Sequence, residues 1–495
     1  MVRRVKSVER SLAEADEPGH RLAKVLRARD LVVFGVGVII GTGIFVLTGQ
    51  QAARNAGPAV VLSFLLAGVT CAFAALCYAE LASSVPVAGS AYTFAYATLG
   101  EVVAWVIGWD LLLELMLGAA VVARGWSAYL QQLLDLPAWV AGDAARPDLA
   151  AIAIVVLLGL LLVRGTKESS RVTTVLVGVK VAVVLIVIAV GIRYVDTANF
   201  SPFIPAAQHE PAAAGSILHE PIIQSMLGLE PSRFGWFGVV AAASVVFFAF
   251  IGFDIVATTA EETVNPQRDM PRGILGSLAV CTLLYMAVAA VLTGMVRYTE
   301  LNTAAPLAEA FDLIGVTWAA KVISLGAVAG ITTTILVLLL GQTRVLFAMA
   351  RDGLVPSGLA RVHPRFGTPW LITLIVCAAV AVLAGVVPLA SLSELVSIGT
   401  LFAFVVVCVG VLVLRRSRPD LPRAFRVPGV PWIPLAGVLT CGWLMLNLPL
   451  ETWLRFVIWM VVGLVVYGLY GRRHSTLANA SATNSDDHGP RDVSS

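Results

Sequence analysis

The chain has 495 residues, of which 58% are hydrophobic and only 13% are charged, with a formal net charge of +3. Soluble proteins carry roughly 25% charged residues, so this composition excludes a soluble multi-domain protein and indicates a polytopic membrane protein. The small net charge gives no reason to expect a nucleic-acid partner. All six cysteines fall in apolar stretches, so we expect neither a disulfide framework nor a cysteine metal site.

Twelve membrane spans are predicted along the chain. Residues 1–30 carry charges of both signs without a short apolar core, which indicates a cytoplasmic segment rather than a signal peptide. Residues 471–495 are rich in Ser, Asn and Asp, which predicts a disordered cytoplasmic tail. Because a span needs about 20 apolar residues, the predicted spans are 31–52, 59–83, 101–130, 149–164, 173–193, 236–260, 272–297, 318–350, 369–386, 391–414, 431–448 and 451–470.

The distribution of Lys and Arg predicts the orientation of these spans. With the N-terminus inside, the cytoplasmic segments hold most of the basic residues. The outer segments then hold only Arg54, Arg146, Arg193, Arg233 and Arg297. An even number of spans agrees with this orientation. We therefore expect a multi-pass protein of the cell membrane with both termini in the cytoplasm.

Two apolar spans, the first and the sixth, are interrupted by glycine. The interruptions lie in Gly35–Phe45 and in Phe247–Asp254. Unwound backbone at membrane depth is tolerated only where it lines a cavity or holds a ligand. Broken helices at matching positions of two repeats point to a transporter binding site.

These breaks divide the chain into two halves. Spans 1–5 (31–193) and 6–10 (236–414) each open with a broken helix, separated by an extracytoplasmic loop (194–235). Since five is odd, the second half enters the membrane from the opposite side, which predicts an inverted repeat. The two last spans (415–470) lie outside it. The predicted fold is thus all-α, with twelve transmembrane helices.

Each break has a functional and a structural interpretation. Around Gly41–Gly43, free amides at the start of the second half-helix suit a carboxylate and free carbonyls suit a cation; the alternative is close helix packing through small residues. In the second break, Gly252 adjoins a carboxylate at membrane depth, where insertion costs about 2.5–3.5 kcal/mol. Asp254 therefore faces a cavity or caps the second half-helix.

Three further groups of polar residues lie inside predicted spans. Glu114 and Asp110 are one helical turn apart and should face the bundle interior. They could serve in proton coupling, as a counter-charge for a cationic substrate, or as a buried structural pair. Lys180 either snorkels to the interface or places its ammonium between helices, where a sodium ion would otherwise bind.

Hydroxyl groups lie in the middle of the eighth span. They belong to Thr332, Thr333 and Thr334, and we take the first two as site candidates. Threonine hydroxyls in a membrane helix either bond back to their own helix or coordinate a cation.

The chain resembles the amino acid–polyamine–organocation superfamily of permeases, and within it the cationic amino acid transporter family. The matching strings are GVGVIIGTGIFVLTG (35–49), CYAELASSVPVAGSAYTFAY (77–96), GWDLLLE (108–114) and FFAFIGFDIVATTAEETVNPQRDMPRGI (247–274). The resemblance implies the five-plus-five inverted-repeat fold of LeuT. It also implies proton coupling through Lys180, which matches a lysine of bacterial relatives. Substrate recognition would fall to Ile40, Gly41, Thr42 and Gly43 in the first break and Phe247, Ala249, Phe250 and Ile251 in the second.

The function expected from these features is proton-coupled uptake of cationic or small neutral L-amino acids by alternating access. An amino acid exchanger on the same fold is the alternative. Enzymatic activity is not expected, since the sequence contains no H-E-x-x-H, G-x-S-x-G or P-loop pattern. We expect no cofactor or metal apart from the coupling proton. The expected partners are an amino acid and the lipid bilayer, with a monomer as the simplest oligomeric state.

Overall fold

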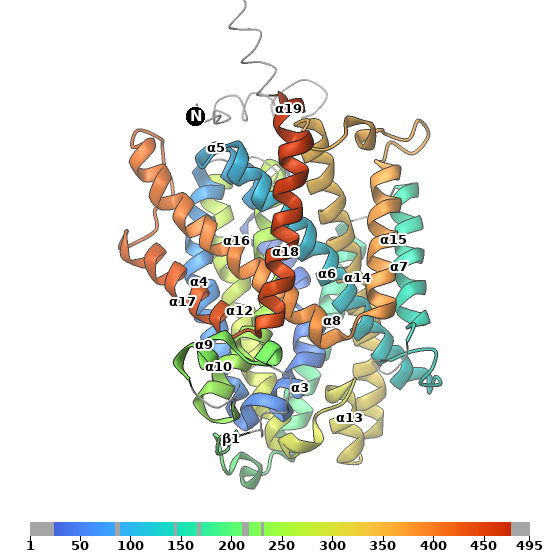
Figure 1. Cartoon of the computed structure of the whole chain (residues 1–495). Helices are drawn as coiled ribbons and strands as arrows, with labels where there is room; N and C mark the ends of the chain where they lie inside the picture. Colours follow the sequence, from blue (N-terminus) through green and yellow to red (C-terminus); the bar gives the residue numbers. More distant parts are fainter. Residues whose placement is uncertain are drawn as a thin grey trace, which may run out of the picture.

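The structure of the chain is a computed structural model that describes residues 24–84, 90–142, 146–165, 170–209, 217–228 and 232–476. Its helices stand side by side in one bundle (Figure 1). Within the described residues, strands are limited to the antiparallel pair β1 (Gln208–His209) and β2 (Ser232–Arg233). Most of the predicted N-terminal segment and of the predicted tail lies outside the described residues.

Apolar helices occupy the ranges predicted as spans. Eight helical segments of the described chain are long and apolar enough to cross a membrane, which makes the protein a polytopic membrane protein. They are Gly43–Ser84, Val175–Tyr194, Gly235–Val256, Leu450–His474 and the helices α6 (Glu101–Leu134), α12 (Pro266–Met295), α14 (Thr317–Arg351) and α16 (Leu389–Ser417). The first of these segments includes α4 (Val60–Ser84), and Val175–Tyr194 lies largely in α8 (Ser170–Gly191).

The structure has eight segments of this length where the sequence predicts twelve spans, for two physical reasons. Three of the apolar helices are short: α7 (Leu149–Arg164), α15 (Trp370–Val386) and α17 (Trp432–Leu446). The first predicted span is divided, because α2 (Ala28–Ile39) ends before the glycines and helical structure resumes only at Gly43.

The two broken spans are composed of short helical pieces. After α2, the first continues as the π-helical turn η1 (Gly43–Leu47), α3 (Thr48–Gln51) and η2 (Ala52–Ala56), and a short turn η3 (Gly57–Ala59) leads into α4. The second consists of α10 (Gly235–Val246), η7 (Phe247–Phe250), α11 (Phe253–Val256) and η8 (Ala257–Glu262).

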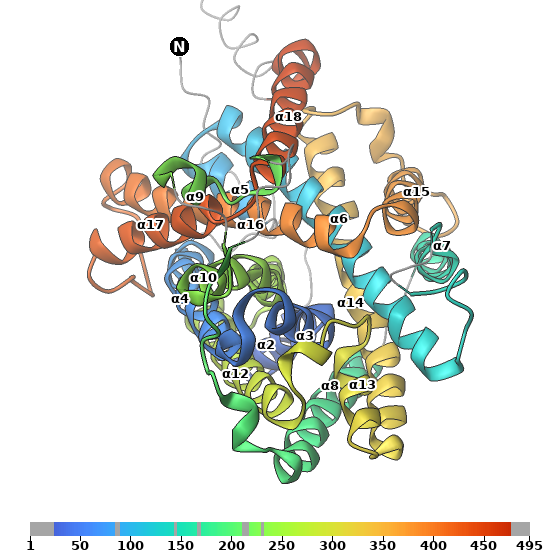
Figure 2. The ribbon, with the colours of Figure 1, turned by 60° about the horizontal axis from the view of Figure 1, so that its bottom comes forward.

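The broken helices lie inside the bundle and the short helices at its edge. Figure 2 shows α2 and α3 among α4, α10, α12 and α14, whereas α7 with α15, α17 and α18 (Leu450–Val466) lie at the periphery. Outward-facing apolar side chains cover these outer helices, such as Leu157 (63% exposed) and Leu439 (71% exposed). Such faces fit a lipid environment.

The short elements gather at the two ends of the bundle. One end carries α5 (Ser90–Thr98) and α19 (Arg472–His474), and the other carries α13 (Pro306–Leu313) and the strands (Figure 1). The remaining short elements are η4 (Ile192–Tyr194), η5 (Thr197–Phe200), η6 (Ile217–His219), α9 (Ile222–Leu227), η9 (Tyr298–Glu300), η10 (Ser357–Ala360) and η11 (Tyr467–Gly471).

Candidate functional site at two broken helices

The first break is a short non-helical link in contact with the second break. Ile40 has extended backbone angles (φ −70°, ψ 100°), and Gly43 starts the next helical turn. A Cβ atom on Gly43 would clash with the Cα and Cβ atoms of Ala249. Only glycine therefore allows the two breaks to approach this closely.

The second break depends on a glycine conformation. Gly252 has a φ of 119°, in the region that other residues rarely adopt, and it directly precedes α11. Its backbone N–H donates to Oδ1 of Asp254 at 3.2 Å. The carboxylate thus bonds to the start of this half-helix, although Gly252 holds the N-cap position and Asp254 lies in the first turn.

A tyrosine hydroxyl joins the two breaks. Tyr285 of α12 lies with its hydroxyl 2.8 Å from the carbonyl oxygen of Ile39 and 2.9 Å from that of Ala249. Its ring packs against Phe250, with centroids 5.3 Å apart. Tyr285 was not among the predicted site residues. A tyrosine within an apolar helix, whose hydroxyl needs a partner away from water, is the signal that could have found it.

The ammonium of Lys180 lies between three helices. Its Nζ donates to the carbonyl oxygens of Gly37 (2.7 Å) and Ile40 (3.2 Å) and to Oγ1 of Thr334 (2.8 Å). The side chain is completely buried. Lys180 therefore does not snorkel to the membrane interface, and each of its three N–H groups has an acceptor.

The three threonines of α14 have different surroundings. Thr332 donates to the carbonyl of Val328 at 2.7 Å, and Thr333 to that of Gly330 at 2.7 Å, so both bond within their own helix. Only Thr334 reaches the first break, where it also contacts the carbonyl of Ile40 at 3.4 Å.

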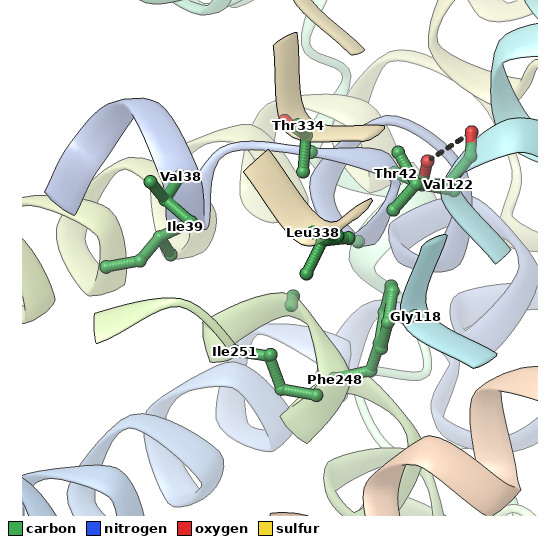
Figure 3. Close-up of a pocket in the computed structure, with 12 residues that line it drawn as sticks. Val38, Ile39, Thr42, Gly118, Val122, Phe248, Ile251, Thr334 and Leu338 are labelled. Carbon is green, nitrogen blue, oxygen red and sulfur yellow. Dashed lines mark hydrogen bonds between the residues drawn. The ribbon is translucent and has the colours of Figure 1, made fainter. Parts of the chain in front are cut away.

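A buried cavity lies between the two breaks (Figure 3). The open space inside it would hold about one water molecule, so the two breaks nearly close on each other in this conformation. Walls come from both breaks and from α6 and α14. The lining residues are Val38, Ile39, Gly41, Thr42, Gly43, Gly118, Val122, Phe248, Ala249, Ile251, Thr334 and Leu338.

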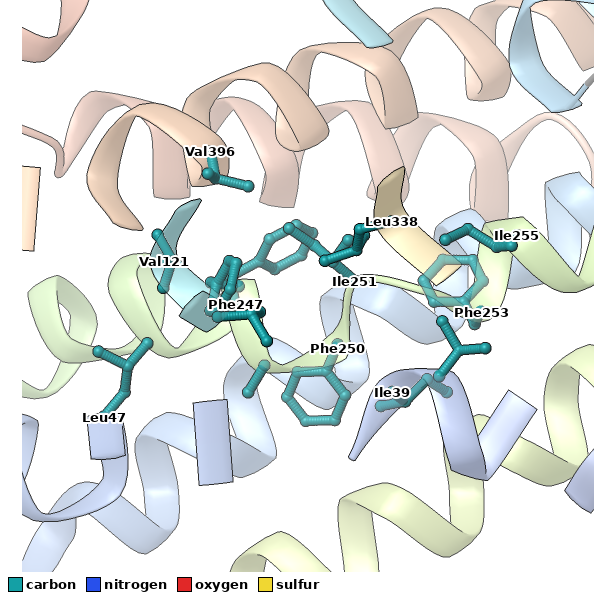
Figure 4. Close-up of a cluster of buried hydrophobic side chains, with 14 of the residues drawn as sticks. Ile39, Leu47, Val121, Phe247, Phe250, Ile251, Phe253, Ile255, Leu338 and Val396 are labelled. Carbon is teal, nitrogen blue, oxygen red and sulfur yellow. The ribbon is translucent and has the colours of Figure 1, made fainter. Parts of the chain in front are cut away.

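Five predicted substrate-binding residues line this cavity, and three do not. Ile40 instead presents its carbonyl to Lys180. Phe250 packs on Tyr285, and Phe247 packs on Phe404 with centroids 5.6 Å apart. Figure 4 shows these phenylalanines within the apolar cluster around the second break.

The other lining residues were not predicted as site residues. They are mostly apolar and look like any other helix-forming residue of a membrane span, so composition gives no signal for them. Spacing does give one on α6. Glu114, Gly118 and Val122 follow one another at four-residue intervals, which places them on one face of the helix.

The buried carboxyls of α6 continue this row away from the cavity. Asp110 and Glu114 are 0% and 1% exposed, and their side-chain oxygens have no hydrogen-bond partner among the described residues. Neither lines the cavity. The packing of Asp110 is tight, since a Cβ on Gly399 of α16 would lie 3.0 Å from its Oδ1.

Comparison with known proteins identifies the family. A family model described as amino acid permease matches residues 27–467. The chain belongs to this amino acid permease family, within the superfamily that the sequence motifs indicate. The resemblance to that superfamily is thereby confirmed.

Relatives of this permease differ in their named substrates. It is 46% identical to the branched-chain amino acid permease BcaP of Bacillus subtilis, covering 96% of this chain and 98% of the relative. It is 45% identical to the methylthioribose transporter of the same organism, covering 94% and 96%. It is 32% identical to cationic amino acid transporter 4, vacuolar, of Arabidopsis thaliana, covering 97% of each.

Proposed function

We propose that this permease is a secondary active transporter that takes up an amino acid together with a proton. The observation that carries this proposal is the meeting of two helix breaks at a buried cavity, beside the ammonium of Lys180. In secondary transporters, the substrate site is typically formed by discontinuous helices whose ends face a common cavity.

The helix ends at the cavity match the two charges of an amino acid. The amides at the start of the helical run from Gly43 suit a carboxylate, because a helix N-terminus carries partial positive charge. The carbonyls at the end of η7, beside Ile251, suit an ammonium group.

The topology we infer for this transport is twelve spans in a five-plus-five inverted repeat. The positions of the two breaks, at the start of residues 31–193 and of 236–414, support it. The short helices α7, α15 and α17 complete the twelve, since a bilayer thins locally around a short apolar stretch. The excess of Lys and Arg in alternate loops supports two cytoplasmic termini in the cell membrane.

Proton coupling is assigned to buried groups on both sides of the cavity. A buried lysine can exchange its proton, and a neutral Lys180 amine would have only two N–H groups for three acceptors. Deprotonation would therefore leave one of these acceptors, on α2, the first break or α14, without its N–H donor. Glu114, which is buried and has no hydrogen-bond partner among the described residues, is the second candidate.

Uptake into proteoliposomes tests this function. Purified protein is reconstituted, and radiolabelled leucine, alanine, arginine and methylthioribose are added separately with and without an inward proton gradient. Gradient-driven accumulation of an amino acid is the expected result. Uptake only into vesicles preloaded with amino acid, indifferent to pH, would instead identify an exchanger. Uptake of methylthioribose alone would contradict an amino acid substrate.

A further inference from the structure

We propose that the cavity selects neutral amino acids with apolar side chains, and that Gly118 sets the upper limit on side-chain size. This inference rests on the proposed function, because it specifies the substrate of the same site. It concerns the part of the cavity formed by α6 and α14, away from the polar ends of the two breaks.

Among the described residues, no charged side chain lines the cavity. Among its lining residues only Thr42 and Thr334 carry polar side chains. The hydroxyl of Thr42 lies 3.4 Å from the carbonyl of Val122 (Figure 3), and that of Thr334 accepts from Lys180. A guanidinium or ammonium side chain would thus enter a buried space without a carboxylate, and burying an unpaired charge is highly unfavourable.

The ammonium group next to the cavity has the wrong sign of charge for a cationic substrate. Lys180 lies behind Thr334, one hydrogen bond of 2.8 Å from a lining residue. The nearest carboxyl along α6 belongs to Glu114, about 6 Å further down the helix axis than Gly118 at a rise of 1.5 Å per residue. Since Glu114 does not line the cavity, its carboxylate is not available to a side chain bound there.

Gly118 has no side chain, so it leaves space in the cavity that the side chain of any other amino acid would occupy. A Cβ atom added to Gly118 would lie 3.8 and 3.9 Å from the two methyl carbons of Leu338, which is ordinary contact. The fold therefore accommodates alanine at this position. The added methyl group would nevertheless occupy the cavity, because Gly118 lines it.

The same two helices provide a matched control. Gly341 of α14 faces Leu115 of α6, and an added Cβ would lie 3.7 and 3.9 Å from its methyl carbons. Gly341 does not line the cavity. Gly118→Ala and Gly341→Ala thus add the same methyl group at the same helix interface, once inside the cavity and once outside it.

The experiment measures the KM of uptake for alanine, valine, leucine and arginine in proteoliposomes of the parent protein and both variants. In the parent, we expect leucine and valine to be transported and arginine not to compete. One methyl group of lost space changes discrimination in an apolar pocket by roughly 10-fold or more. Gly118→Ala should therefore raise the KM for leucine by this factor while leaving alanine nearly unchanged. Gly341→Ala should match the parent.

Each other outcome overturns a defined part of the inference. Competition by arginine as strong as by leucine would refute neutral selectivity but leave amino acid transport intact. If Gly118→Ala raised the KM for alanine as much as the KM for leucine, this glycine would have a structural role and would not set the limit on side-chain size. Absence of uptake for every amino acid would refute the proposed function itself. Should Gly118→Ala fail to fold, Val122→Ala tests the same wall, because the enlarged cavity should gain methionine or phenylalanine uptake relative to leucine.

Discussion

Lys180 and Thr334 form a polar contact of 2.8 Å at the centre of an apolar bundle, and both also reach the carbonyl of Ile40. Lys180 comes from α8 and Thr334 from α14, whereas Ile40 belongs to the first break. Their contact connects the break to two separate helices through one positive charge. We therefore expect conformational change at the cavity to depend on that charge.

Replacement of this charge should uncouple transport from the proton gradient. In Lys180→Met, the carbonyls of Gly37 and Ile40 lose a charged donor, and hydrogen bonds to charged groups contribute about 1.5–3 kcal/mol each. We expect proton-driven accumulation in proteoliposomes to be abolished. Thr334→Ala removes one of the three acceptors and should reduce accumulation less.

An exposed lysine serves as the control for this substitution. Lys321 lies on α14 with its side chain exposed, so Lys321→Met should accumulate substrate like the parent. If Lys180→Met also responded to the gradient as the parent does, a role for Lys180 in coupling would be ruled out.

The hydroxyl of Tyr285 should stabilise the position of the two breaks relative to each other. Tyr285→Phe keeps the ring contact with Phe250 but removes the hydroxyl that reaches Ile39 and Ala249. Buried groups left without a partner lower stability by about 1–3 kcal/mol. We expect a lower melting temperature in detergent and weaker substrate binding.

Tyr194→Phe provides the comparison, because this tyrosine is 45% exposed. Tyr194→Phe should leave the melting temperature and the substrate affinity unchanged. An unaltered melting temperature and affinity in Tyr285→Phe would show that ring packing alone holds the breaks together.

The sequence predicts the parts of this site that depend on unusual residues. Glycines in an apolar span mark the breaks, and a lysine in the fifth span marks the ammonium, because both are unfavourable there without a reason. Val38 and Leu338 are ordinary residues of membrane helices. Their place in the cavity wall follows from how α2, α6 and α14 pack, which no local pattern encodes. For the same reason Phe247 and Phe250, though next to the break, pack in the apolar cluster instead of lining the cavity.

The carboxyl of Glu114 should affect the pH dependence of uptake rather than substrate recognition. Glu114 is buried, has no hydrogen-bond partner in the part of the chain that the structure describes, and does not line the cavity, so Glu114→Gln preserves the shape of the site. We expect the increase of uptake at acidic external pH to disappear in this variant, while exchange between preloaded vesicles and medium persists. Asp110→Asn should affect the pH profile less, since Asp110 lies one turn further from the cavity. Loss of exchange together with accumulation would instead indicate a structural role for Glu114.

Glu80 should be the ion-pair partner on which stability depends most. Its carboxylate, 1% exposed, accepts from Arg415 Nε at 2.9 Å and from the Val427 backbone N–H at 2.7 Å, which ties the end of α4 to the end of α16 and the following loop. Arg415→Leu leaves this buried charge with the Val427 amide and with Arg423, whose Nε lies 3.4 Å from Oε1 of Glu80. Removal of one partner of a buried pair costs up to about 3–5 kcal/mol. The exposed pair Arg455–Glu451 is the control, because such i,i+4 pairs contribute only about 0.3–0.5 kcal/mol. Melting in detergent should therefore fall strongly for Arg415→Leu and hardly for Arg455→Leu, and equal melting temperatures would mean that the Val427 amide and Arg423 suffice to hold Glu80.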